Sequence, residues 1–148
     1  MKVASKREQI TWAINMSEKN ISGQFDSIDE QIEMLEENSS TETNEALDKL
    51  VTDVSLICRK LLETYAGAYD KQLPDSNDLL ELFKAFVKGD PSLTATRDNI
   101  RELVYYRNCI NENRFDALPQ NPHKMALHTI RHIYLYLRSR ADQEGLLD

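Results

Sequence analysis

The chain has 148 residues, of which 41% are hydrophobic and 29% charged, and it contains four glycines and four prolines. This composition is that of one globular domain, and the scarcity of glycine and proline favours helices over a turn-rich sandwich or barrel. No apolar run approaches the roughly 20 residues that cross a bilayer, and no apolar segment follows the basic N-terminus as in a signal peptide. The sequence therefore predicts a single domain over residues 1–148, located in the cytoplasm and without a membrane partner.

Charge is distributed unevenly along the chain, and the net charge is −7. Residues 1–96 carry 10 Lys and Arg against 18 Asp and Glu, whereas residues 97–140 carry 8 against 4. All three histidines and seven of the nine arginines lie in the later segment. This asymmetry indicates either an anionic partner for the C-terminal helices or acidic and basic helices that pair, within one chain or between subunits.

The N-terminal half predicts two long helices joined by a polar turn. Apolar residues at heptad spacing predict a first helix over residues 5–37. A polar link over residues 38–43 follows, in which Ser39 and Glu42 have the spacing of a capping box. Two such helices form an antiparallel hairpin. The apolar stripe of the second helix consists of Leu47, Leu50, Val51, Val54, Ile57, Cys58, Leu61, Leu62 and Tyr65.

A short helix is predicted after this hairpin. Asp75 or Ser76 should cap its N-terminus, because both side chains accept hydrogen bonds from backbone N–H groups. Gly89 followed by Pro91 should end it, in the order that is usual for helix C-termini.

Two further helices complete the predicted fold. The fourth should begin at Ser92 or Thr94 and fray near Arg114, before a rigid loop. The last should start with Asn121 as its cap and Pro122 in its first turn. The sequence thus predicts an all-α bundle of four to five helices with a long N-terminal antiparallel hairpin.

An arginine stands on the apolar face of the predicted fourth helix. A guanidinium at such a position needs a carboxylate, a ligand or a water-filled cleft, because burying it unpaired is costly. The partner of Arg107 is therefore either a carboxylate of the bundle, in a purely structural role, or a bound phosphate. The residues that share its face at steps of three and four are Ile100, Leu103, Val104, Ile110, Asn111 and Arg114.

The polar residues near Arg107 predict an anion-binding surface. Arg101 and Arg114 lie about two turns to either side of it, and Asn108 supplies a neighbouring hydrogen-bond donor. Three guanidiniums near one face would attract a nucleotide or the phosphate backbone of RNA. Basic residues and histidines of the last helix extend this surface. The predicted ligand-binding residues are Arg101, Arg107, Asn108, Asn111, Arg114, His128 and Arg131.

The helix order and the Arg107–Asn108 pair resemble the HEPN superfamily of small α-helical bundles. Members commonly dimerise around a helix with an R-x(4–6)-H motif, and many are metal-independent ribonucleases in toxin–antitoxin or defence systems. The histidine of the motif is missing here, because its three candidate positions hold Glu112, Asn113 and Arg114. The resemblance therefore implies a non-catalytic homodimer that binds RNA, a nucleotide or a protein partner through the Arg107 helix.

Two other functions remain open. In one, the arginines only pair with the acidic hairpin, and the protein is an adaptor, an antitoxin or a phage-type regulator that binds other proteins. In the other, it is a metal-independent ribonuclease in which Arg107 and His128 form an unconventional catalytic pair. His128 and His132 have a spacing that can chelate zinc, but without a third ligand we expect no metal and no other cofactor. Cys58 and Cys109 are predicted to be reduced core thiols.

Overall fold

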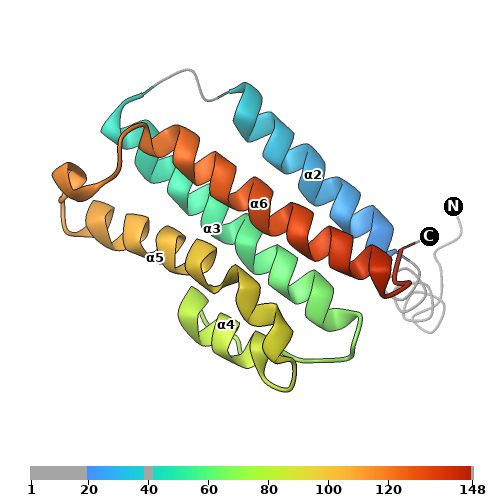
Figure 1. Ribbon diagram of the computed structural model, residues 1–148. Helices are drawn as coiled ribbons and strands as arrows, with labels where there is room; N and C mark the ends of the chain where they lie inside the picture. Colours follow the sequence, from blue (N-terminus) through green and yellow to red (C-terminus); the bar gives the residue numbers. More distant parts are fainter. Residues whose placement is uncertain (1–19, 39–41, 148) are drawn as a thin grey trace, which may run out of the picture.

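The computed structural model describes residues 20–38 and 42–147, and these residues form an all-α bundle (Figure 1). The predicted fold class is thereby confirmed, and no strand occurs in the described part of the chain. Within the same part, no helix combines the length and the apolar character that crossing a membrane requires. The helices are α2 (Ile21–Glu37), α3 (Asn44–Gly67), α4 (Leu79–Val87), α5 (Arg97–Asn111) and α6 (Pro122–Gln143), with two short 3-10 helices, η1 (Pro91–Thr96) and η2 (Phe115–Ala117).

The helices α2 and α3 pack side by side and run in opposite directions (Figure 1). Phe25, Ile28 and Ile32 of α2 are buried, as the heptad pattern predicts. The predicted first helix also included residues 5–19, which lie outside the described residues. All nine residues of the stripe predicted for the second helix are buried in α3, so its period identified the inner face correctly.

Two helix starts differ from the predicted caps. The side chain of Thr43 caps α3, accepting a hydrogen bond from the backbone N of Ala46 at 3.1 Å. Ser39 of the predicted capping box lies outside the described residues. The side chain of Asp78 caps α4, accepting from the backbone N of Leu80 at 2.9 Å. Asp75, a predicted cap, lies instead 3.2 Å from Nη2 of Arg59.

The predicted start of the fourth helix is also too early. Ser92 and Thr94 belong to the 3-10 helix η1, where the Thr94 hydroxyl donates to the backbone oxygen of Pro91 at 2.7 Å, and α5 begins only at Arg97. The start of α6 agrees with the prediction, because Asn121 is its N-cap and Pro122 opens its first turn. Asn121 adopts a left-handed backbone with φ of 55° and makes no side-chain cap bond.

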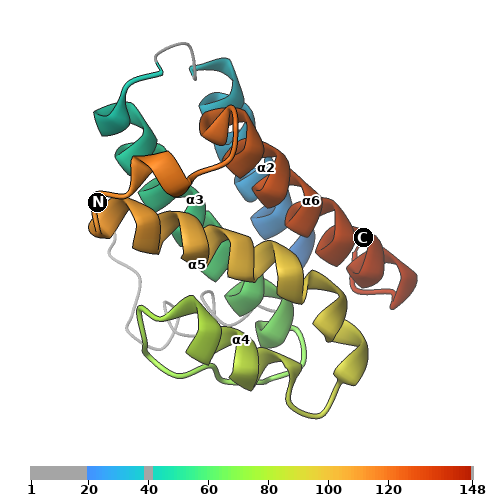
Figure 2. The same cartoon turned by 60° about the vertical axis from the view of Figure 1, so that its left-hand side comes forward.

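The central helix of the bundle is α3, which packs against α2, α4, α5 and α6. Figure 2 shows α5 lying across α3, with α4 below it and α6 beside it. Cys58 of α3 and Cys109 of α5 are free and buried, as predicted for core thiols. Burial raises the pKa of the Cys58 thiol to about 12, so this group stays protonated and unreactive at neutral pH.

Truncation of Leu61, which is fully buried in α3, should reveal how much the bundle depends on this helix. We expect Leu61→Ala to lower the free energy of unfolding by about 2–5 kcal/mol, because it removes apolar contacts and leaves a cavity. The matched control is Leu56→Ala on the same helix, since Leu56 is 54% exposed. Urea denaturation followed by circular dichroism measures both, and equal losses would contradict the assigned core.

Candidate functional site

Arg107 projects from α5 toward α3, where its guanidinium meets a carboxylate. Its Nη2 lies 2.5 Å from Oδ1 of Asp48, and its Nη1 donates to the hydroxyl of Thr52 at 2.6 Å. Its Nε donates to Oδ1 of Asn111 at 3.1 Å. The side chain is 26% exposed, so it is shielded without being sealed from solvent. These contacts are the ones that a structural arginine makes between two helices of a bundle.

The other predicted residues of this helix point in different directions. Arg101 and Asn108 are exposed on the outer side of α5, and Arg101 has no ion-pair partner in the described part of the chain. Arg114 lies beyond the end of α5 and pairs with a carboxylate two residues later at 3.1 Å. Of the predicted set, Asn111 is the residue that the structure brings into contact with Arg107.

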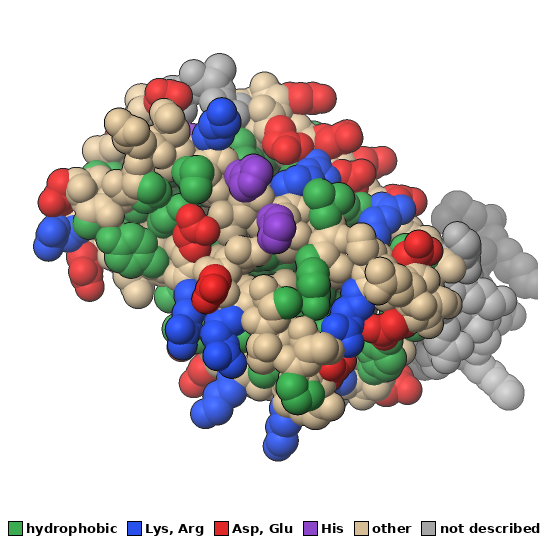
Figure 3. Space-filling model, in the orientation of Figure 1, with side chains coloured by type: hydrophobic (Ala, Val, Ile, Leu, Met, Phe, Trp, Pro, Cys, Tyr) green, Lys and Arg blue, Asp and Glu red, His purple; other side chains and the backbone are tan. Residues whose placement is uncertain are grey.

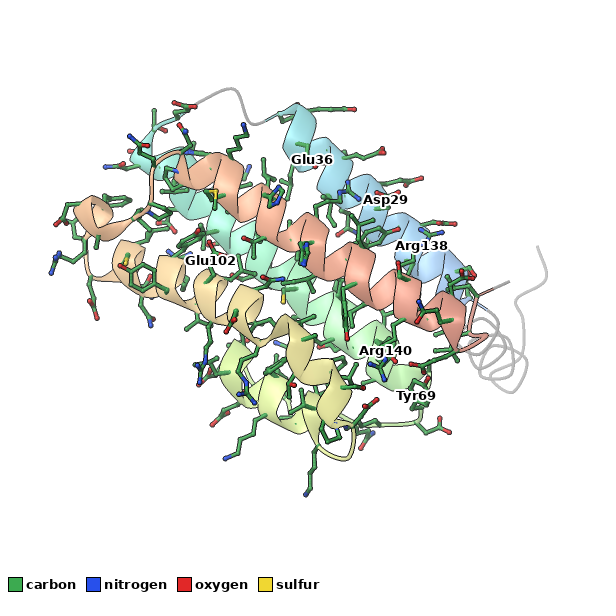
Figure 4. The ribbon with its side chains drawn as sticks, in the orientation of Figure 1. Asp29, Glu36, Tyr69, Glu102, Arg138 and Arg140 are labelled. Carbon is green, nitrogen blue, oxygen red and sulfur yellow. The ribbon has the colours of Figure 1, made fainter. Side chains whose placement is uncertain are left out.

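Arg131 of α6, another predicted anion-binding residue, is directed at α2. Its Nη1 lies 2.5 Å from Oδ1 of Asp29, and its Nη2 lies 2.7 Å from Oε1 of Glu36. Figure 4 shows that both carboxylates lie along α2 where it runs beside α6. His128 is exposed on α6 and takes no part in the contacts of Arg107. Arg131 therefore joins two helices rather than forming one patch with Arg107.

A second arginine of α6 extends this contact with α2. Nη2 of Arg138 lies 2.8 Å from Oδ1 of Asp26. The guanidinium carbons of Arg131 and Arg138 lie 5.3 and 5.8 Å from the centre of the Tyr134 ring, within the range of cation–π attraction. We call this set of contacts the α2–α6 arginine seam. It pairs the acidic helix α2 with the basic helix α6 inside one chain, as one reading of the charge asymmetry proposed.

The histidines of α6 occupy two different environments. His128 and His132 are exposed, whereas His123 is buried and its Nε2 has no hydrogen-bond partner. Figure 3 shows two histidine side chains close together on one face. Among the described residues, no group of three or more His, Cys, Asp or Glu is arranged to hold a metal ion. A pair of histidines without a third ligand does not make the usual zinc site.

A continuous groove follows the outer side of the α2–α3 contact. It consists of three adjoining hollows of about 320, 280 and 220 Å³, and neighbouring hollows share lining residues. The α2–α3 groove is lined by residues at heptad steps, namely Gln24, Ser27, Gln31 and Met34 on α2 and Asp53, Leu56, Lys60 and Glu63 on α3. Two rows of residues with this spacing form a surface against which a third helix can pack.

The α2–α3 groove is apolar at its centre and acidic along its α2 side. Met34 is 60% exposed and Leu56 is 54% exposed, although both are large hydrophobic residues. The helix α2 carries six acidic and no basic residues. Its Glu30 and Glu37 flank Met34 at helical steps of four and three, and neither has an ion-pair partner among the described residues. Figure 3 shows Asp and Glu side chains gathered along α2.

A further hollow lies at the end of the bundle where α3, α4 and α6 all end. We call it the C-terminal cleft; its volume is about 690 Å³. Its lining includes Tyr65, Tyr69, Lys71, Phe86, Asp90 and Arg140. This cleft was not predicted from the sequence, because its walls come from segments up to 79 residues apart that carry no common motif.

An ion-pair network fixes one wall of the C-terminal cleft. Nη2 of Arg140 lies 3.0 Å from Oδ2 of Asp90, and its Nε lies 2.8 Å from Oε1 of Glu144. The Tyr65 hydroxyl donates to the same oxygen of Glu144 at 2.6 Å. Burial is the larger cause and this hydrogen bond the smaller, and together they raise the pKa of Tyr65 to about 12. The hydrogen bond from Ser92 lowers the pKa of Asp90, which is therefore ionised at neutral pH.

Comparison of the chain with protein-family models, curated proteins and solved structures finds no match. The functional argument therefore rests on the residues and their geometry.

Removal of Arg131 should show whether the α2–α6 arginine seam stabilises the fold. We expect Arg131→Ala to lower the free energy of unfolding by about 1–3 kcal/mol, because Asp29 and Glu36 lose a shared partner that is 22% exposed. The loss should shrink at high salt, since screening weakens the pairs. Arg101→Ala, which removes an exposed arginine without an ion pair, should change stability by less than about 0.5 kcal/mol. Urea denaturation at two salt concentrations provides the measurement, and equal effects of the two variants would contradict a stabilising seam.

Proposed function

We propose that this protein is a non-catalytic helical bundle that binds another protein, in the class of adaptors and regulators. The observation that carries the proposal is the internal use of the arginines. Arg107, Arg131, Arg138 and Arg140 all bind carboxylates of the same chain, and their side chains are only 22–33% exposed. Their charge serves the contacts between helices, which leaves less positive surface for RNA or a nucleotide.

The α2–α3 groove supplies a surface for such a partner. Apolar side chains as exposed as Met34 and Leu56 commonly mark interaction sites when polar residues surround them. The heptad spacing of the two walls suits an α-helix that lays its apolar face into the groove. A helix bound there would turn the α2–α3 pair into a three-helix contact.

Charge defines the chemistry of this partner. The α3 wall is balanced, because Lys49 and Lys60 line the groove together with Asp53 and Glu63. The α2 side adds Glu30 and Glu37, so the groove and its rim are negative overall. The partner is therefore a basic amphipathic helix, with leucine-like residues on Met34 and Leu56 and Lys or Arg beside the glutamates.

A designed helical peptide tests this proposal. The probe is a peptide of about 21 residues with leucine at heptad positions a and d and lysine at e and g. We expect saturable binding that becomes at least about tenfold weaker in Met34→Glu and in Leu56→Glu, because each buries a charge against leucine. Fluorescence anisotropy with a labelled peptide measures the affinities.

Two controls make the result specific. Leu135→Glu changes a hydrophobic residue of α6 that is 53% exposed and lies outside the groove, so it should leave binding unchanged. A glutamate version of the peptide should bind far more weakly, because it meets like charge. The protein variants Met34→Glu and Leu56→Glu each add a negative charge, which by itself would strengthen non-specific attraction of the basic peptide. Unchanged or tighter binding by the groove variants would therefore contradict the proposal.

A second candidate function, RNA binding, is favoured by one observation. Arg97 and Arg101 of α5 are exposed without ion pairs in the described part of the chain, and Lys84 of α4 is exposed as well. Figure 3 shows Lys and Arg side chains gathered beside α4 and α5. This surface includes one residue, Arg101, of the anion-binding set predicted from the sequence. The resemblance to the HEPN superfamily, and dimerisation through the Arg107 helix, remain predictions.

Salt dependence of RNA affinity distinguishes the second candidate from the first. If RNA binds at α4 and α5, Arg101→Ala should weaken a single-stranded RNA several-fold and lower the salt slope by about one ion. Lys49→Ala, on the opposite side of α3, should leave both quantities unchanged. Filter binding over a range of salt concentrations provides the measurement. Absence of binding at about 50 mM salt would exclude this function.

A further inference from the structure

The C-terminal cleft has the size and composition of a small-molecule site. Its volume of about 690 Å³ lies within the range of roughly 300–1,000 Å³ that is usual for ligand pockets. It shares no lining residue with the α2–α3 groove, so a ligand here would be independent of the proposed protein partner. Figure 4 shows Arg140 and Tyr69 at this end of the bundle.

Three aromatic rings form the apolar part of the cleft. The ring of Tyr65 lies 5.5 Å from that of Tyr69 and 5.7 Å from that of Phe86, measured between centroids. Tyr65 and Phe86 are buried, whereas Tyr69 remains 49% exposed at the edge of the cleft. The ring of Tyr69 is thus supported by its neighbours and still offers surface on which a flat group can stack.

The hydrogen-bond donors that remain free at the cleft belong to lysine side chains. Lys71 donates to the backbone oxygens of Phe86 and Lys88 at 2.6 and 2.5 Å, which uses two of the three N–H groups of its ammonium. The Lys88 ammonium is exposed and has no hydrogen-bond or ion-pair partner within the described residues.

Both carboxylates of the cleft are hydrogen-bonded to groups of the protein. Both oxygens of Asp90 are in use, one by Arg140 at 3.0 Å and the other by Ser92 at 2.5 Å. Oε1 of Glu144 accepts from Tyr65 and from Arg140. Three basic residues and two acidic residues line the cleft, which leaves a surplus of one positive charge.

From this arrangement we propose that the C-terminal cleft binds a small aromatic carboxylate. The ring of the ligand stacks on Tyr69, and its carboxylate accepts hydrogen bonds from Lys71 and Lys88. A monoanion would balance the surplus of one positive charge, whereas a cation would add to it. The site would recognise a flat ring and an acid in one molecule, because the aromatic wall contacts the ring and the lysines contact the carboxylate.

Three probes with one ring system test the role of ligand charge. These are indole-3-acetate, its neutral amide and the cationic tryptamine, with phenylacetate as a smaller acid. We expect the two acids to shift the backbone amide signals of Tyr69, Lys71 and Gly89 in saturable NMR titrations of the full chain. Tryptamine should bind at least about tenfold more weakly than indole-3-acetate, since it brings the wrong charge. Equal binding of all three indoles, shifts elsewhere, or no saturation by either acid at roughly 5 mM would overturn the proposal.

Variants of two equally exposed tyrosines test the position of the ring. Tyr69→Ala should weaken indole-3-acetate by about fivefold, whereas Tyr69→Phe should preserve its affinity. Tyr105→Ala is the matched control, because Tyr105 is also 49% exposed but lies on α5 outside the cleft. Lys88→Met removes an exposed cation without disturbing the end of α4 and should weaken both acids but not the amide. Equal affinities of Tyr69→Ala, Tyr105→Ala and the unaltered protein would overturn the assignment.

Discussion

The helix α3 is surrounded on most of its circumference, and the other helices depend on that contact. Its buried residues include Leu47, Val54 and Leu61, and α2, α4, α5 and α6 all pack against it. The bundle gains most of its stability from such burial, because short helices such as α4 are marginal in water when they are isolated. Within the described residues, the row of α3 from Asp53 to Glu63 remains accessible beside α2. The groove is therefore the side on which the central helix lacks a full-length neighbour.

Ion pairs between α2 and α6 favour one register of these two helices. The six acids of α2 fall into two groups: Asp26, Asp29 and Glu36 meet the arginines of α6, whereas Glu30, Glu33 and Glu37 do not. Partly exposed pairs contribute modestly to stability, but several pairs along one seam restrict sliding of the two helices. The same helix thus supplies an internal contact with one edge and a negative external surface with the other.

Helical periodicity made the inner faces predictable, because burial follows spacing along one helix. The nine-residue stripe of α3 is an instance. The cap of α4 was not predictable, since Asp75, Ser76 and Asp78 are all suitable acceptors within one turn. Asp75 instead contacts the distant Arg59, and the sequence does not reveal that contact. The partner of Arg107 is equally remote, because Asp48 lies 59 positions earlier in the chain. Sequence reasoning identified an arginine that needs a partner but could not locate the carboxylate.

The two proposed binding surfaces follow from one difference in how acidic groups are used. At the C-terminal cleft, Asp90 and Glu144 are hydrogen-bonded to Arg140, Ser92 and Tyr65, so the charged groups left to bind a ligand are cationic. Along the α2–α3 groove, Glu30 and Glu37 are exposed without an ion pair among the described residues, so the charged groups left to bind a partner there are anionic. A basic helix and an aromatic acid would therefore select different surfaces, the side of the α2–α3 pair and the end of the bundle. Because no lining residue is shared, occupation of one site need not alter the other.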